Sequence, residues 1–139
     1  MRERTLVPAV HGFLDTIRDG HPTTPIALVT PIICPISEDH PGPTLLGRDE
    51  RFHVVPRTVE LSTGALTLRR VRQLVGDVVA VGQGEGDTDL HLVDGLALFA
   101  PDDVGDLHDD LHPNADGYRR IGERFHDLVS ADGGPFSHR

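Results

Sequence analysis

Apolar residues recur at helical spacing over the first twenty residues, and this periodicity predicts an amphipathic helix. The positions on the apolar face are Leu6, Val10, Phe13, Leu14 and Ile17. Pro8 is expected in the first turn of this helix, because an interior proline removes a backbone hydrogen bond. Gly20 is expected to end the helix in a conformation with positive φ.

Two short apolar runs predict strands. Residues 25–31 form a continuous run bounded by prolines, which is typical of a strand buried on both faces of a parallel sheet. Residues 90–94 alternate between apolar and polar side chains and predict a second strand. A helix followed by a short turn and a buried strand is the pattern of an α/β fold.

Two further helices are predicted from the same periodicity. The first is capped by Ser62 or Thr63. Its apolar face holds Leu68, Val71, Leu74, Val75 and Val78. The second starts with Pro113 at its first position. Its apolar stripe holds Tyr118, Ile121, Phe125 and Leu128. Residues 32–56, which are rich in proline, are predicted to be irregular, and residues 95–110 to form an acidic loop.

Charge narrows the range of partners. The chain has 139 residues and a net charge of -9, with 22 acidic residues against 13 basic ones. This balance disfavours nucleic acids and anionic membrane surfaces, which attract clustered Lys and Arg. No apolar stretch is long enough to span a membrane, and no secretory signal follows Met1, so a cytoplasmic location is expected from the sequence as given. The lone cysteine, Cys34, is interpreted as a small core residue that forms no internal disulfide.

Asp109 and His112 are the candidate catalytic residues. A histidine that acts as a general base needs one ring nitrogen free to take a proton and the other held by an acceptor. Asp109 lies three residues before His112 on a loop that leads into the last helix, so the two side chains can meet directly. Pro113 stiffens the segment that follows. The pair therefore predicts a compact acid–base unit.

The residues around this pair resemble the last motif of the SGNH (GDSL-type) hydrolases. The pattern is Asp109-x-x-His112-Pro113, followed by Asn114 and by Gly117-Tyr118. Residues 31–44 are similar to a loop after the fourth strand of bacterial SGNH esterases, and residues 94–96 to the stretch after the last strand. The resemblance implies a partial three-layer α/β/α (flavodoxin-like) fold with parallel strands, whose first strands are missing. Residues 1–132 would be the C-terminal part of such a domain, and residues 133–139 a flexible tail.

The resemblance also implies a function, which is hydrolysis of a small carboxylic ester. His112 would be the base of a Ser–His–Asp triad and Asp109 its orienting acid, with no cofactor and no metal. The family's Gly-Asp-Ser nucleophile and its oxyanion-hole motifs are absent from the sequence. The serines present are Ser37, Ser62, Ser130 and Ser137. The isolated chain is therefore expected to be inactive, with the missing N-terminal half of the domain as its possible partner.

Other interpretations stay open. Asp106, His108, Asp109 and His112 are spaced closely enough to form a metal site with two histidines and two carboxylates. Alternatively, the chain is a non-catalytic remnant or an interaction module that keeps the Asp109–His112 pair as a relic. In a further interpretation, His112 only caps a helix and Asp109 is a solvated loop residue.

Overall fold

We describe residues 2–137 of the protein from a computed structural model. The elements in chain order are α1 (Glu3–Gly20), β1 (Ile26–Val29), α2 (Pro35–Glu38), β2 (Thr44–Leu46), β3 (Phe52–Val54), α3 (Val59–Ser62), α4 (Leu68–Gly84), β4 (Leu90–Val93), α5 (Gly95–Leu98), a 3-10 helix (Pro101–Asp106) and α6 (Ala115–Ser130).

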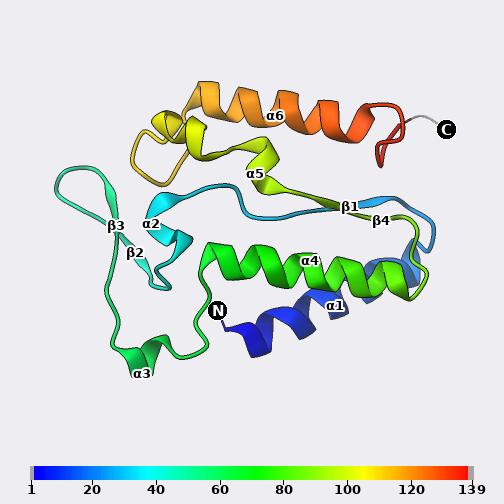
Figure 1. Ribbon diagram of the computed structural model, residues 1–139, viewed down its shortest axis with the longest axis horizontal. Coiled ribbons are helices and arrows are strands. Elements are labelled where there is room, and N and C mark those ends of the chain that lie inside the picture. The colour runs from blue at the N-terminus through cyan, green and yellow to red at the C-terminus, as the bar shows by residue number, and fades with distance from the viewer. Residues whose placement is uncertain (1, 138–139) are drawn as a thin grey trace.

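Strands β1 and β4 form a parallel pair between layers of helices, which confirms the predicted α/β class with parallel strands. Ile26 lies opposite Leu90, and the register continues to Val29 opposite Val93. Helices α1 and α4 lie on one side of the pair and α6 lies on the other (Figure 1). The connection through α4 supplies the long crossover that a parallel pair requires.

Separate apolar clusters hold the helical layers against the two strands. On one side, Leu14 of α1 packs with Val78 and Val79 of α4 and with Leu90 of β4. On the other side, the cluster consists of Val93, Leu98 and Val129. A third cluster of Ile33, Phe99 and Leu107 anchors the segments that follow the strands. The carboxyl ends of the strands are therefore fixed in place, and the candidate site lies beyond them.

The expectation that β1 is buried on both faces is wrong. Ile26, Ala27 and Leu28 are half-buried, and Val29 is 40% exposed. Leu92 of β4 is 44% exposed. In the part of the chain that the structure describes, this sheet has two strands. Each strand therefore has a neighbour on one side only, and the apolar run of β1 is incompletely covered.

The first helix is confirmed, but its predicted ends are wrong. Helix α1 begins at Glu3, so Pro8 lies inside the helix, beyond its first turn. Gly20 belongs to the helix, and His21 is the C-cap. Phe13, which was predicted on the apolar face, is exposed. The helix therefore packs a narrower face than its periodicity indicates.

The cap predicted for the next long helix lies too early in the sequence. Ser62 belongs to the short helix α3, and Thr67 is the N-cap of α4 because its side chain accepts a hydrogen bond from the Arg70 N–H at 3.1 Å. Helix α4 runs on to Gly84, because Val78 and Val79 are buried against the strands. Tertiary packing thus outweighs the β-propensity of this valine-rich stretch.

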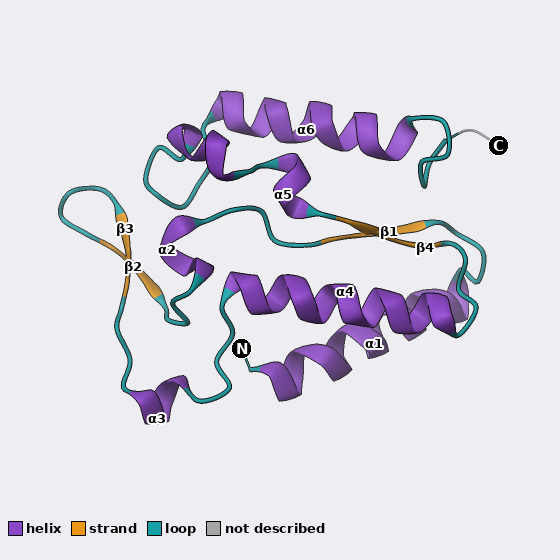
Figure 2. Ribbon diagram, in the orientation of Figure 1, coloured by secondary structure: helices purple, strands orange, loops and turns teal. Residues whose placement is uncertain are grey.

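Residues 32–56 are more regular than predicted. Strands β2 and β3 form an antiparallel hairpin, with Leu46 opposite Phe52, and the hairpin lies beside α2, away from the parallel pair (Figure 2). Helix α5 and the 3-10 helix likewise occupy the region predicted as an acidic loop, residues 95–110. Proline and glycine in these regions predicted breaks, whereas the hairpin pairs residues that are only six to ten positions apart in the sequence.

The last helix begins after its predicted start. Asn114 is the N-cap of α6, and Pro113 precedes it instead of occupying the first helical position. Tyr118 and Leu128, predicted on the apolar stripe, are exposed, whereas Val129 is buried. The inward face is therefore rotated relative to the predicted stripe.

The remaining sequence predictions concern the C-terminal tail, Cys34 and membrane-spanning segments. Of the predicted tail, residues 138 and 139 lie outside the described residues. Within the rest, the Phe136 N–H donates to the Val129 carbonyl at 2.8 Å. Cys34 is buried, as expected for a core residue. Among the helices of residues 2–137, none combines the length and apolar character needed to cross a membrane.

Gly95 provides a test of how tightly the strand ends are packed. A Cβ at this position would collide with the backbone carbonyls of Thr30 and Pro31. We expect Gly95→Ala to lower the free energy of unfolding by about 3 kcal/mol, measured by urea denaturation. The control is Gly122, an exposed residue of α6 at which a Cβ would meet no other atom within 4 Å. Gly122→Ala is expected to stabilise the protein by about 0.5–1 kcal/mol, and equal effects of the two changes would contradict this packing.

Candidate acid–base site

The candidate residues lie on the loop between the 3-10 helix and α6. Leu107 and Pro113 form an isolated antiparallel bridge across the base of this loop. The His108 N–H donates to the His112 carbonyl at 3.2 Å. These contacts fold residues 107–113 back on themselves and bring the side chains of Asp109 and His112 to the same place.

The carboxylate of Asp109 binds the imidazole of His112 directly. Nδ1 of His112 lies 2.7 Å from Oδ2 of Asp109. The other carboxylate oxygen, Oδ1, accepts hydrogen bonds from the backbone N–H of Leu111 at 3.0 Å and from that of His112 at 2.7 Å. Because the carboxylate only accepts, Nδ1 carries a proton, and in the neutral imidazole Nε2 then has the lone pair.

The environment of Asp109 keeps its carboxyl group ionised. Burial raises the pKa of Asp109, but the hydrogen bonds from the His112 side chain, the His112 N–H and the Leu111 N–H outweigh that effect. The net result is a pKa well below the usual value for aspartate. A carboxylate that stays charged can hold the imidazole and stabilise the imidazolium that forms when His112 takes a proton.

The ring of His112 is open to solvent on one side and covered by Phe52 on another. The side chain of Asp109 is 12% exposed, whereas that of His112 is 50% exposed. The rings of Phe52 and His112 meet edge-to-face, with centroids 5.3 Å apart and an interplanar angle of 76°. Among the described residues, Nε2 of His112 has no hydrogen-bond partner. This nitrogen is therefore available to an incoming group.

Phe52 was missed in the sequence because its role depends on the hairpin. Its backbone N–H donates to the Asp109 carbonyl at 2.9 Å, which ties β3 to the candidate loop. Arg51 reinforces the contact through an ion pair with Asp110 at 2.7 Å. Asp110 has a φ of 68°, a left-handed conformation that aspartate tolerates better than most residues. No local signal in the sequence predicts these contacts.

The N-terminus of α6 fixes the other end of the loop. The side-chain oxygen of Asn114 accepts from the Gly117 N–H at 2.9 Å, and its Nδ2 donates to Asp106 at 3.2 Å. The Asn114 N–H also donates to the Asp106 carbonyl at 2.7 Å. The helix is thus capped by Asn114 and not by His112, whose side chain is engaged with Asp109.

Asp103 connects the 3-10 helix to α6 through two arginines. Its carboxylate pairs with Arg120 at 2.6 Å and with Arg124 at 2.5 Å, and it accepts from the Ala100 N–H at 2.8 Å. The hydrogen bond from Arg124 is the largest cause that lowers the pKa of Asp103, against the opposing effect of burial. This cluster holds the frame on which the candidate loop is built.

The Asp103 cluster makes stability depend on pH. The folded pKa of Asp103 is lowered, so its contribution is complete above the unfolded value of about 4 and is lost as the pH falls toward the folded value. We expect Asp103→Asn to lower the free energy of unfolding by about 2 kcal/mol at pH 7, with a smaller difference from the unmodified protein at pH 3. Urea denaturation at both pH values measures this.

Asp116 offers the matched control, because its pair with Arg119 at 2.8 Å lies on the exposed face of the same helix. Asp116→Asn is expected to cost less than about 1 kcal/mol. A cost at Asp103 that does not change between pH 7 and pH 3 would show that the carboxylate charge contributes nothing.

The four residues of the metal hypothesis do not converge on one point, because Asp106 pairs outside the set. Asp106 pairs with Arg120 at 2.9 Å, and Nε2 of His108 lies 3.6 Å from Oδ2 of Asp109. No group of three or more His, Cys, Asp or Glu side chains that could hold a metal ion occurs within residues 2–137.

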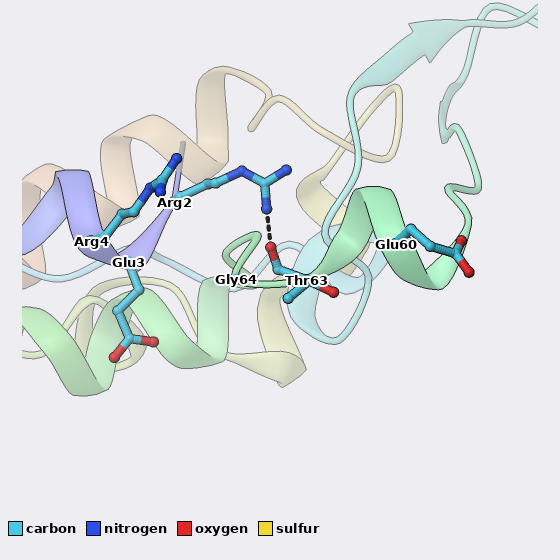
Figure 3. A pocket seen from close by; sticks show the side chains of 6 residues that line it. All are labelled: Arg2, Glu3, Arg4, Glu60, Thr63 and Gly64. Carbon is cyan, nitrogen blue, oxygen red and sulfur yellow. Dashed lines mark hydrogen bonds between the residues drawn. The ribbon is translucent and has the colours of Figure 1, made fainter.

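Two cavities lie away from the candidate pair. One of about 640 Å³ is at the start of α1, where Arg2 donates to the Thr63 carbonyl (Figure 3). No residue of the loop that carries His112 lines it. A second, of about 470 Å³, is lined by His40 and Pro41 on one side and by Val54 and Val55 on the other. It adjoins β3, the strand that carries Phe52.

No serine of the described residues makes a hydrogen bond to His112. Ser37 and Ser62 lie in α2 and α3. Ser130 is 3.3 Å from His126, and Ser137 donates to the Gly134 carbonyl at 2.9 Å. Cys34, the other residue that could act as a nucleophile, is buried, and burial raises the pKa of its thiol. Within the described residues, His112 is therefore hydrogen-bonded to neither a serine nor Cys34.

Comparison with solved structures gives an informative likeness. No family model matches the chain, and no curated protein matches it. Among solved structures, the chain is similar to SsfX3, a salicylyl-acyltransferase from a tetracycline biosynthetic pathway, with 25% sequence identity and a TM-score of 0.66. The match covers 91% of this chain and 32% of SsfX3. The chain therefore spans about a third of the length of that acyltransferase.

The identification with the SGNH hydrolases is corrected by these comparisons. No family model supports it, and the similar structure is described as an acyltransferase. The resemblance rested on a few residues around His112 and on loops rich in proline. Such short patterns are weak indicators of family, because the same local geometry serves different proteins. The likeness supports an enzyme-like α/β fold and goes no further.

Proposed function

We propose that Asp109 and His112 are the acid–base pair of a site that transfers an acyl group from a carboxylic ester, either to water or to another alcohol. The observation that carries this proposal is the 2.7 Å contact between Nδ1 of His112 and Oδ2 of Asp109, with Oδ1 held by two backbone N–H groups. This arrangement is what a histidine needs to deprotonate a hydroxyl group.

The likeness to an acyltransferase supports the choice of acyl chemistry. Attack on an ester by a hydroxyl group needs a base to remove the proton and then an acid to protonate the departing alkoxide. His112 performs both steps through Nε2, and Asp109 stabilises the imidazolium between them. The reaction requires no redox change, so the pair needs no cofactor for its part.

The nucleophile and the oxyanion donors are proposed to come from polypeptide outside these 139 residues. None of the serines of the described residues is hydrogen-bonded to His112, and Ser130 and Ser137 bind other groups. In the proposed reaction, a serine Oγ bonds to the carbonyl carbon and gives its proton to Nε2 of His112. The ester C–O bond then breaks, and the leaving oxygen takes the proton back. Water or an alcohol releases the acyl group from serine by the same steps.

Labelling with a fluorophosphonate, read by intact mass, tests this proposal. We expect no adduct on the 139-residue chain. The second sample is a fusion protein in which this chain replaces the matched third of SsfX3. We expect one fluorophosphonate adduct on the fusion protein, and we expect its formation to be abolished or strongly slowed in the His112→Ala variant. An adduct on the isolated chain that requires His112 would contradict the proposal that the nucleophile lies elsewhere.

A further inference from the structure

The outer edge of β1 carries backbone groups that no other part of the described chain binds. The Ile26 N–H donates to Asp89 at 2.8 Å, and the Thr30 N–H donates to Val93 at 3.0 Å. In a parallel ladder the residues alternate, so Ala27 and Val29 direct their N–H and C=O groups away from β4. None of these outward groups has a backbone partner among the described residues.

The outer edge of β4 differs from that of β1. The carbonyl of Leu90 accepts a hydrogen bond from Nε2 of Gln83 at 2.8 Å, so the end of α4 occupies part of this edge. The Leu90 N–H also approaches the Asp87 carbonyl at 3.5 Å. A strand that joined the sheet on this side would have to displace Gln83. The edge of β1 is therefore the more open of the two.

The exposed apolar side chain of Val29 indicates that the edge of β1 lacks a neighbouring strand within residues 2–137. Val29 is 40% exposed although it belongs to a run of four apolar residues. Parallel strands are normally buried on both faces, and an apolar strand with a free edge is prone to pair with another chain. The chain shows neither a proline nor a charged residue in β1 that would block such pairing.

The carboxyl end of β1 leads to the loop that carries His112. The Ile33 N–H, four residues beyond the strand, donates to the Phe99 carbonyl at 3.2 Å. The next residue, Cys34, has its Sγ 3.8 Å from the Asp110 carbonyl. In α/β proteins the functional groups gather beyond the carboxyl ends of parallel strands. A strand laid parallel to β1 would end on the side of the molecule where His112 lies.

We infer that the edge of β1 formed by Ala27 and Val29 is the docking site for an apolar strand of the polypeptide that supplies the nucleophile, running parallel to β1. The inference rests on the proposed function for the identity of this partner. The match to about a third of SsfX3 supports it, because that acyltransferase has further chain to provide such a strand. Pairing would satisfy the outward groups of β1 and cover Val29.

Hydrogen exchange of individual amides tests the inference without using activity. In the isolated chain at low concentration, the Ala27 and Val29 amides should exchange fast, while the Leu28 amide, which faces β4, is protected. In the fusion protein with SsfX3 we expect the protection of Ala27 and Val29 to rise by about 100-fold or more, with Leu28 as the internal control. Unchanged exchange at both residues in the folded fusion protein would overturn the inference.

The concentration dependence of the exchange identifies what occupies the edge of β1. If Ala27 and Val29 become protected in the isolated chain as its concentration rises, a second copy is the occupant and the inference is wrong.

We also expect Val29→Lys to leave the melting temperature of the isolated chain nearly unchanged but to lower that of the fusion protein. Equal effects in both would overturn the docking site. Protected amides in a fusion protein that lacks acyl transfer would leave the docking site standing and remove only the proposed function.

Discussion

Changing His112 to alanine in the fusion protein with SsfX3 should lower kcat/KM for ester cleavage by about 10⁴- to 10⁶-fold. The variant loses the group that takes the proton from the nucleophile and returns it to the leaving oxygen. Initial rates with an aryl ester such as p-nitrophenyl acetate measure the effect. Folding is expected to be retained, because the side chain of His112 is half-exposed and contributes little to the core.

His126 provides the matched control for this experiment. It lies on the exposed face of α6, where its Nδ1 contacts the hydroxyl of Ser130 at 3.3 Å. We expect His126→Ala to change the rate by less than about fivefold, the equivalent of about 1 kcal/mol. If His112→Ala lowers the rate of ester cleavage as little as His126→Ala does, His112 is not the base.

Asp109→Asn should produce the second largest effect, a loss of about 10⁴-fold in kcat with little change in KM. Asparagine can place its N–H₂ group toward Nδ1, which favours the imidazole tautomer with the proton on Nε2. That tautomer cannot accept a proton from the nucleophile. The contact at 2.7 Å between Asp109 and His112 is the basis of this expectation.

Asp110 supplies a neighbouring control with the same change of side chain. Its carboxylate pairs with Arg51 on the protein surface at 2.7 Å, away from the imidazole. Asparagine also tolerates the left-handed φ of this position. We expect Asp110→Asn to cost less than about fivefold in kcat. Equal losses from the two variants would mean that general disturbance of the loop, and not the orientation of His112, lowers the rate.

The parts of the fold that were predictable depend on local patterns. The apolar run of β1 and the alternation of β4 are patterns of adjacent residues, so both strands could be predicted from the sequence. Their parallel arrangement could be predicted because the run of β1 is continuous and follows a helix. The helices α4 and α6 were predictable for the same reason, because each has a periodic apolar pattern. Their ends were misplaced, because Thr67 and not Ser62 caps α4, and Asn114 and not Pro113 begins α6. Several residues near each end could serve as caps, and only tertiary contacts select one of them.

The candidate site was predictable only in its central pair. Asp109 and His112 are three residues apart, so a single loop determines their contact. Phe52 reaches the same place from a hairpin more than fifty residues earlier, and no periodicity links it to His112. Likewise, the burial of β1 was overestimated because the number of strands beside it does not follow from its own residues. The mistaken family identification has a related origin, since it extended a local pattern to the whole chain.

The protonation of the His112 ring is the property on which the proposed mechanism depends. Asp109 must hold the proton of His112 on Nδ1 and leave Nε2 as the base. The two ring nitrogens have distinct ¹⁵N chemical shifts, and long-range ¹H–¹⁵N correlation spectra of the labelled 139-residue chain above the pH at which the ring is charged report the tautomer directly. We expect Nδ1 protonated and Nε2 bare in the unmodified chain, with a shift toward the opposite tautomer in Asp109→Asn. A proton on Nε2 in the unmodified chain, or spectra that do not change in Asp109→Asn, would contradict the assignment of His112 as a base oriented by Asp109.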